Sequence, residues 1–88
     1  MDVNSKVPVS AIRFLRCSSV LTVMGLSKSE LYRRINAGLF IPPIAYGTRM
    51  KVWPCSEVNA IADAYLTGKS EDEIRCLVKR LTEERKHG

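Results

Sequence analysis

The strongest constraint on how this chain folds is a helix-start motif, S-x-x-E, that occurs twice. It stands at Ser27–Glu30 and at Ser70–Glu73, and a glycine lies two residues before each copy, at Gly25 and Gly68. In such a capping box the serine hydroxyl and the glutamate carboxylate each accept a backbone N–H at the start of a helix. Glycine tolerates the left-handed conformation that ends a preceding helix. The motif therefore divides the chain into short helices at two defined points.

Two helices are predicted around the first of these points. Apolar residues at helical spacing predict the first helix, which runs from Cys17 to a stop at Gly25. The second is expected from Lys28 to Ala37, with Leu31 and Ile35 on its inward face. Two helices joined by so short a turn form a helical corner.

Extended structure is predicted beyond Pro42-Pro43, because proline lacks a backbone N–H and cannot continue a helix. The segments Ile44–Tyr46 and Arg49–Trp53 flank a turn that contains Gly47, and they predict a β-hairpin. Alternation places the two basic residues of the second strand on one face. A further short strand is predicted at Ile12–Leu15.

Two more helices complete the pattern. The third is predicted from Glu57 to Thr67, with Ser56 as its N-cap. The fourth follows the second capping box and carries a clean apolar stripe: Ile74, Leu77, Val78 and Leu81. That stripe has two interpretations, packing on its own domain or joining a second copy of the chain. The basic side chains around it are expected on a solvated face: Arg75, Lys79, Arg80 and Arg85.

Composition limits the class of protein. The chain has 88 residues, 45% of them hydrophobic, which is enough for one small core. We expect this core to include Phe14, Val52, Trp53, Val58 and Ile61. No apolar run approaches the roughly 20 residues of a membrane span, and the first residues do not resemble a secretory signal, so a cytoplasmic location is expected.

Catalysis and metal binding are not expected. The three cysteines, Cys17, Cys55 and Cys76, have no CxxC spacing, and the only histidine is His87. No nucleophile–base set or pair of carboxylates is recognisable in the sequence. We therefore expect no enzymatic activity and no cofactor or metal ion.

Charge and element order together indicate a nucleic-acid partner. Fourteen Lys and Arg residues against nine Asp and Glu residues give a net charge of +5, which favours a polyanion. The order of strand, helix, turn, capped helix, hairpin and helix predicts a mainly α fold with a small β-hairpin, the winged helix-turn-helix. In such a fold one helix enters the major groove and the hairpin reaches the flanking backbone or the minor groove.

The second helix carries the candidate DNA contacts. With 100° between successive residues, its outward face holds Ser29, Tyr32, Arg33 and Asn36, with Lys28 beside them. Arg33 suits guanine and Asn36 suits adenine. Glu30 precedes Arg34 by four residues, a spacing that predicts a helix ion pair and a local supporting role for Arg34. Tyr32 has a second interpretation as an aromatic residue at the edge of the core.

One stretch of the chain is similar to a known protein family. It runs from about Ile12 to Leu66 and has its most specific part at Gly25–Ser29 and Leu31–Arg33, with Phe40–Pro43 and Arg49–Trp53 further along. These residues resemble AlpA-like phage regulators and excisionases, which are similar in fold to the DNA-binding domain of the MerR group. The resemblance implies a MerR-like winged helix-turn-helix.

The same resemblance implies one of two roles on DNA. Some members activate or repress an integrase or excision gene, and others act as recombination directionality factors that bend attachment-site DNA. It places the recognition-helix segment at Ser27, Lys28, Ser29, Tyr32 and Arg33, and the wing at Thr48, Arg49 and Lys51. The implied partners are double-stranded DNA at an attachment site or promoter, with an integrase and further copies of the protein as additional candidates. No membrane or small-molecule substrate is implied.

This reading divides the chain into three parts. Residues 1–10 are expected to be a flexible arm, 11–68 the DNA-binding domain, and 69–88 a C-terminal helix with a polar tail. The alternative function is that of an adaptor, in which the C-terminal amphipathic helix binds an integrase or repressor.

Overall fold

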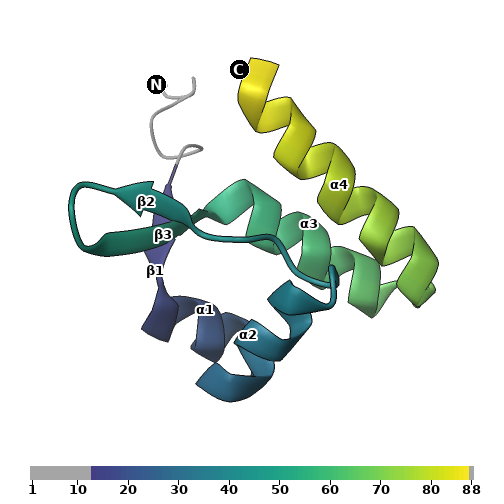
Figure 1. The fold of residues 1–88 in the computed structure, drawn as a ribbon. Coiled ribbons are helices and arrows are strands. Elements are labelled where there is room, and N and C mark those ends of the chain that lie inside the picture. The colour runs from purple at the N-terminus through teal and green to yellow at the C-terminus, as the bar shows by residue number, and fades with distance from the viewer. Residues whose placement is uncertain (1–12, 88) are drawn as a thin grey trace, which may run out of the picture.

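The computed structural model describes residues 13–87, which form four helices and one three-stranded antiparallel sheet (Figure 1). In chain order the elements are β1 (Phe14–Arg16), α1 (Cys17–Met24), α2 (Lys28–Asn36), β2 (Ile44–Tyr46), β3 (Met50–Pro54), α3 (Cys55–Leu66) and α4 (Glu71–His87). The expected mainly helical fold with a small sheet is confirmed. The arm predicted at residues 1–10, and Ile12 of the predicted first strand, lie outside the described residues.

The helical corner forms where the glycine and the capping box predict it. Gly25 ends α1 in the left-handed conformation, with φ of 68°, and its N–H donates to the carbonyl of Leu21. The Ser27 hydroxyl accepts the N–H of Glu30 at 3.2 Å and so caps α2. At the start of α4 both halves of the box form, because Ser70 also donates its N–H to the Glu73 carboxylate at 2.8 Å.

The sheet has the strand order β1-β3-β2, and the β2–β3 hairpin extends from the helical body on the side away from α4 (Figure 1). Tyr46 pairs with Met50, which leaves Gly47, Thr48 and Arg49 as the turn. The prediction that Arg49 begins the second strand was therefore wrong by one residue. Gly47 adopts a φ of 83°, the left-handed region that the turn requires.

The predicted N-cap of α3 was also wrong. This helix starts at Cys55, directly after β3, and Pro54 occupies the capping position without a side-chain hydrogen bond. Ser56 lies inside the first turn. The physical reason is that β3 remains paired to its end, where the N–H of Cys55 donates to the carbonyl of Arg13 at 2.7 Å, so that no linker separates strand from helix.

One hydrophobic core joins the helices to the base of the sheet. Its fully buried side chains include Val20, Leu31, Phe40, Ile41, Trp53, Val58 and Ile61. Ile74 and Val78 of the apolar stripe are buried in the same core, and Leu77 and Leu81 pack partly buried against it. The apolar stripe of α4 therefore packs on its own domain, the first of the two interpretations. Phe14, by contrast, is 47% exposed and stacks on Tyr46 across the sheet, so its prediction as a core residue was wrong.

The connection from α2 to β2 is irregular, yet its residues Leu39, Phe40 and Ile41 are buried. A buried carbonyl needs a hydrogen-bond donor. Four side chains from three other elements donate here, two to the buried Leu39 and Ile41 and two to the half-buried Ala37 and Pro42 at the ends of the segment. The pairs are Arg75 Nε with Ala37 O at 3.0 Å, Tyr65 Oη with Leu39 O at 3.4 Å, Trp53 Nε1 with Ile41 O at 3.0 Å, and Arg85 Nη2 with Pro42 O at 2.9 Å. We refer to Ala37–Pro42 as the clamped connection.

One of these donors corrects the expectation of a solvated face on α4, because Arg85 is half-buried, whereas Arg75, Lys79 and Arg80 are exposed as expected. Arg75 reaches the end of α2, and Arg85 is held by Glu57 as well as by Pro42. Glu57 is only 8% exposed, and its carboxylate accepts from Arg85 Nη2 at 2.5 Å and from Nε at 3.0 Å. Periodicity does not reveal such contacts, because the partners lie 28 to 43 residues away in the chain.

Replacing Arg85 with methionine should lower the free energy of unfolding by about 3 kcal/mol, because the buried carboxylate of Glu57 loses its partner. Urea unfolding followed by circular dichroism measures this change. The double variant Glu57→Gln with Arg85→Met should recover part of the loss. Arg80→Met, at an exposed position of the same helix, is the matched control. Equal stability of the Arg85 and Arg80 variants would contradict the assignment.

Candidate nucleic-acid interface

Helix α2 exposes a row of polar and basic side chains. Ser27, Lys28, Ser29, Arg33 and Asn36 are all exposed, whereas Leu31 is fully buried and Ile35 is half-buried. The polar residues are therefore exposed and the two apolar residues face inward, as the helical periodicity of the sequence predicts.

Tyr32 differs from its neighbours on α2. It is half-buried, and its ring meets that of Trp53 edge to face with 6.5 Å between centroids. Trp53 is fully buried, so this contact ties the middle of α2 to the base of the hairpin. Of the two interpretations of Tyr32, the aromatic residue at the core edge describes its position in the fold.

Glu30 binds two arginines rather than one. Its carboxylate accepts from Arg34 Nε at 2.9 Å, the predicted ion pair, but also from Arg33 Nε at 2.9 Å and Arg33 Nη2 at 2.5 Å. These bonds from Arg33 and Arg34 lower the pKa of Glu30 to about 2, so the carboxylate is ionised near neutral pH. The bond to Arg33 was missed from the sequence, although its i, i+3 spacing is a recognised signal.

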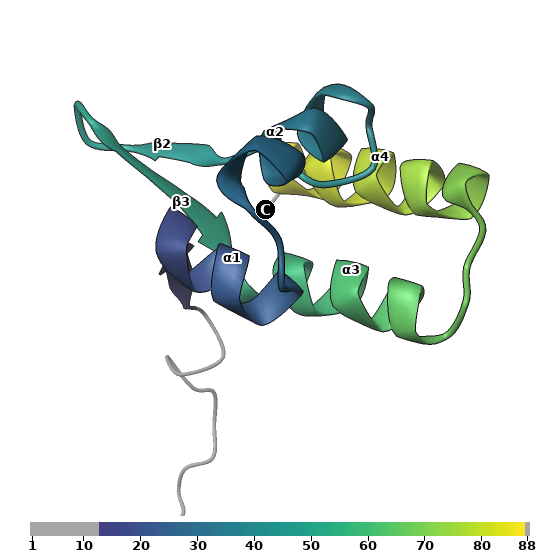
Figure 2. The same cartoon turned by 90° about the horizontal axis from the view of Figure 1, so that it is seen from below.

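The predicted wing residues lie at and next to the tip of the hairpin. Thr48 and Arg49 belong to the turn, Lys51 follows in β3, and all three are exposed. Figure 2, which views the molecule from the side of α1 and α2, shows the hairpin reaching sideways beyond these helices. The base of the hairpin is held by Trp53, which lies in the core. The hairpin therefore has a base anchored in the core and a basic tip, and it belongs to the same half of the chain as α2.

Charge is divided unevenly between the two halves of the chain. Residues 13–56, which include both α2 and the hairpin, contain seven Lys or Arg residues and only one acidic residue, Glu30. Residues 57–88 contain six basic and seven acidic residues. Because Glu30 is itself bound to two arginines, the first half offers no unpaired carboxylate to repel a polyanion. The net positive charge is therefore concentrated on the elements that carry the predicted contacts.

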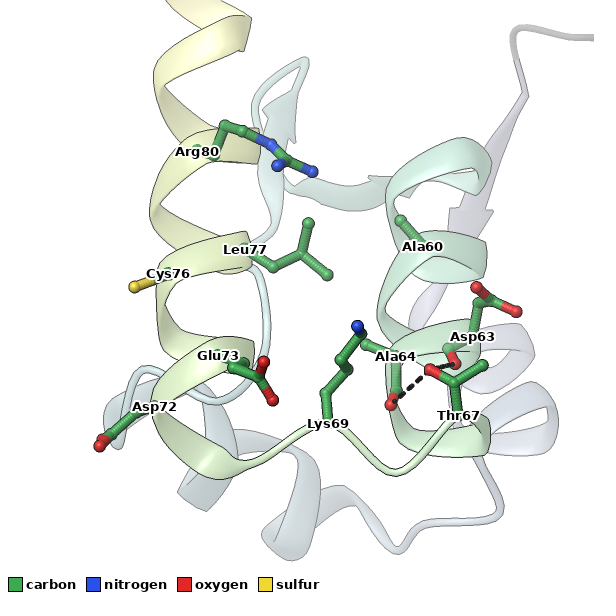
Figure 3. A pocket seen from close by; sticks show the side chains of 10 residues that line it. All are labelled: Ala60, Asp63, Ala64, Thr67, Lys69, Asp72, Glu73, Cys76, Leu77 and Arg80. Carbon is green, nitrogen blue, oxygen red and sulfur yellow. Dashed lines mark hydrogen bonds between the residues drawn. The ribbon is translucent and has the colours of Figure 1, made fainter.

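A separate groove of about 630 Å³ lies between α3 and α4. Figure 3 shows Leu77 reaching from α4 towards Ala60 and Ala64 of α3, while Cys76 points away. Around this apolar floor the lining mixes both charges, with Asp63, Lys69, Asp72, Glu73 and Arg80. Neither α2 nor the hairpin contributes a lining residue, so this groove is distinct from the basic surface.

Comparison with solved structures finds no match, and within residues 13–87 no helix is long and apolar enough to cross a bilayer. A sequence relative, the uncharacterised protein ORF88 of Enterobacteria phage P4, is 37% identical over 57 residues. The matched stretch covers 65% of this chain and 65% of that protein.

A family model also matches the chain. The model is described as "Prophage CP4-57 regulatory protein (AlpA)", and it covers residues 13–61, which run from the start of β1 into α3. That range contains the helical corner, the hairpin and all of the exposed residues of α2 described above. The match covers more than half of the chain and agrees with the resemblance noted in the sequence. The protein therefore belongs to the AlpA family of prophage regulatory proteins.

Proposed function

We propose that the protein binds double-stranded DNA as a winged helix-turn-helix. Helix α2 enters the major groove with Ser27, Lys28, Ser29, Tyr32, Arg33 and Asn36, and the hairpin grips the adjoining backbone with Thr48, Arg49 and Lys51. The observation that carries the proposal is the concentration of seven basic residues against one carboxylate in residues 13–56. Membership of a family of prophage regulators supports the same conclusion. Such a protein would act in the cytoplasm and without catalysis.

The contacts are expected to divide into two kinds. Arg33, on the exposed face of the helix, is proposed to read a base edge, which gives sequence preference. Lys51, beside the hairpin turn, is proposed to contact phosphate, which adds affinity without preference. Tyr32 is half-buried against Trp53, and we propose that its hydroxyl is the part that reaches DNA.

Arg33→Ala should weaken binding to a preferred duplex by about 1–3 kcal/mol and relax the sequence preference, whereas Lys51→Ala should weaken all duplexes alike. Fluorescence anisotropy with two duplexes of equal length measures both effects. With about five phosphate contacts, the slope of log affinity against log salt should be near −4.5, and Lys51→Ala should reduce it by about 0.9.

Lys79→Ala, at an exposed position of α4, removes the same charge at a site away from the proposed surface. It should leave the preference and the salt slope nearly unchanged. Uniform weakening by Arg33→Ala, with altered preference in Lys51→Ala, would reverse the assigned roles and contradict the proposal.

We further propose that the protein acts on a phage or integrated mobile element, either as an excisionase or as a transcriptional regulator of integrase and excision genes. A small module binds weakly by itself, so several copies are expected on repeated sites, where together they bend the DNA. Circular-permutation mobility assays on attachment-site DNA should detect this bend. Straight DNA at saturation would remove the architectural part of the proposal.

A second candidate function is an adaptor that binds an integrase or repressor through the C-terminal helix. The groove between α3 and α4 favours it, because its floor of Ala60, Ala64 and Leu77 is apolar. However, Ile74 and Val78 of the same helix are already buried in the core. An apolar contact of this kind should be nearly insensitive to salt, which separates it from DNA binding.

A further inference from the structure

The two capping boxes of this chain share the S-x-x-E pattern but use their glutamates differently. Glu73 accepts the N–H of Ser70 and closes its box in the usual way. The carboxylate of Glu30 instead binds Arg33 and Arg34. The carboxylate of Glu73 therefore caps its helix. The carboxylate of Glu30 does not cap α2, and its partners are the two arginines.

The three charged side chains form a graded arrangement from the body of the protein to its surface. Arg34 is the innermost, with its side chain 25% exposed and its guanidinium 5.2 Å from the ring centroid of Tyr65 on α3. Glu30 follows at 31%, and Arg33 is the outermost at 65%. Arg34 thus binds the Glu30 carboxylate on the side of the protein body, and the same carboxylate binds the more exposed Arg33.

The remaining donors of Arg33 can be counted. A guanidinium has five N–H groups, and Glu30 takes the one on Nε and one of the two on Nη2. The other Nη2 hydrogen and both Nη1 hydrogens stay available at the tip of the side chain. Two neighbouring donors at this spacing match the O6 and N7 acceptors of guanine in the major groove.

We propose that Glu30 is a positioning residue that fixes the guanidinium of Arg33 so that its tip reads a guanine. The inference rests on the proposed DNA binding. It extends that proposal by assigning a role in sequence specificity to Glu30, the one acidic residue of residues 13–56. Pre-orienting a long side chain reduces the rotamer entropy that binding would otherwise cost. The preference for guanine therefore depends on Glu30 as well as on Arg33.

Two simpler roles for Glu30 make different predictions. If the carboxylate merely repelled phosphate, its removal would strengthen binding to every duplex. If it merely stabilised α2, its removal would weaken binding to every duplex. Positioning predicts opposite signs, with weaker binding where Arg33 reads guanine and equal or tighter binding where it does not.

The test uses the whole 88-residue chain and two duplexes. One is selected by the wild-type protein from a randomised library, and the other has the same composition in shuffled order. Glu30→Gln should bind the selected duplex about tenfold more weakly, the size expected for loss of one good base contact. It should bind the shuffled duplex equally well or more tightly. Replacing the contacted guanine with 7-deazaguanine should weaken the wild type and have little effect on the variant.

Two further variants keep the test decisive. Glu30→Asp retains the charge but shortens the side chain, so it should lose affinity for the selected duplex without gaining affinity for the shuffled one. Glu73→Gln makes the same change in the other capping box and should leave the ratio of the two affinities unchanged. This control also measures what the loss of one box glutamate does to thermal stability.

The outcomes distinguish the inference from the function on which it rests. If wild-type protein binds duplex DNA but the affinities of Glu30→Gln for the two duplexes change in the same direction, the positioning role is wrong and DNA binding stands. If Glu30→Asp preserves the preference in full, charge alone is responsible and the positioning role is again wrong. If the wild type binds no duplex, the proposed function fails and the positioning role fails with it.

Discussion

The fold depends on satisfying the backbone carbonyls of the clamped connection, Ala37–Pro42. This segment connects α2 to the hairpin without regular secondary structure. Its carbonyls therefore do not take part in the backbone hydrogen bonds of a helix or sheet. Side chains from β3, α3 and α4 donate to four of them. Each donor fixes one end or the middle of the connection, and together they set how α2 and the hairpin lie relative to the rest of the protein.

This arrangement gives the C-terminal helix a part in positioning the proposed DNA-binding surface. The family match ends at residue 61, inside α3. Arg75 and Arg85, which hold the two ends of the clamped connection, and the buried Ile74 and Val78 lie beyond that point. In this chain, α4 therefore packs against and hydrogen-bonds the region that the family model matches, although α4 itself lies outside that match. Residues 57–88, which include α4, hold seven acidic residues, against one in residues 13–56.

Local signals predicted the parts of the structure that are decided within a few residues. The capping serine Ser27 and the left-handed Gly25 placed the helical corner within one residue, because both act on adjacent backbone groups. The predictions that failed involve competition between alternative partners, near or far along the chain. Ser56 was not needed as a cap because the paired β3 runs directly into α3. Glu30 closed no box because two arginines on its own helix bind its carboxylate.

The sequence by itself determined the succession of helices and strands, the exposed face of α2, the basic character of residues 13–56 and the resemblance to the AlpA family. These follow from periodicity, turn residues and charge, which act over short stretches of chain. Only the tertiary structure decided that Arg75 and Arg85 bind the clamped connection, that Tyr32 lies against Trp53, and that Phe14 is exposed. Those outcomes depend on which segments meet in space, because a long side chain binds whichever partner the packing of other elements brings within its reach.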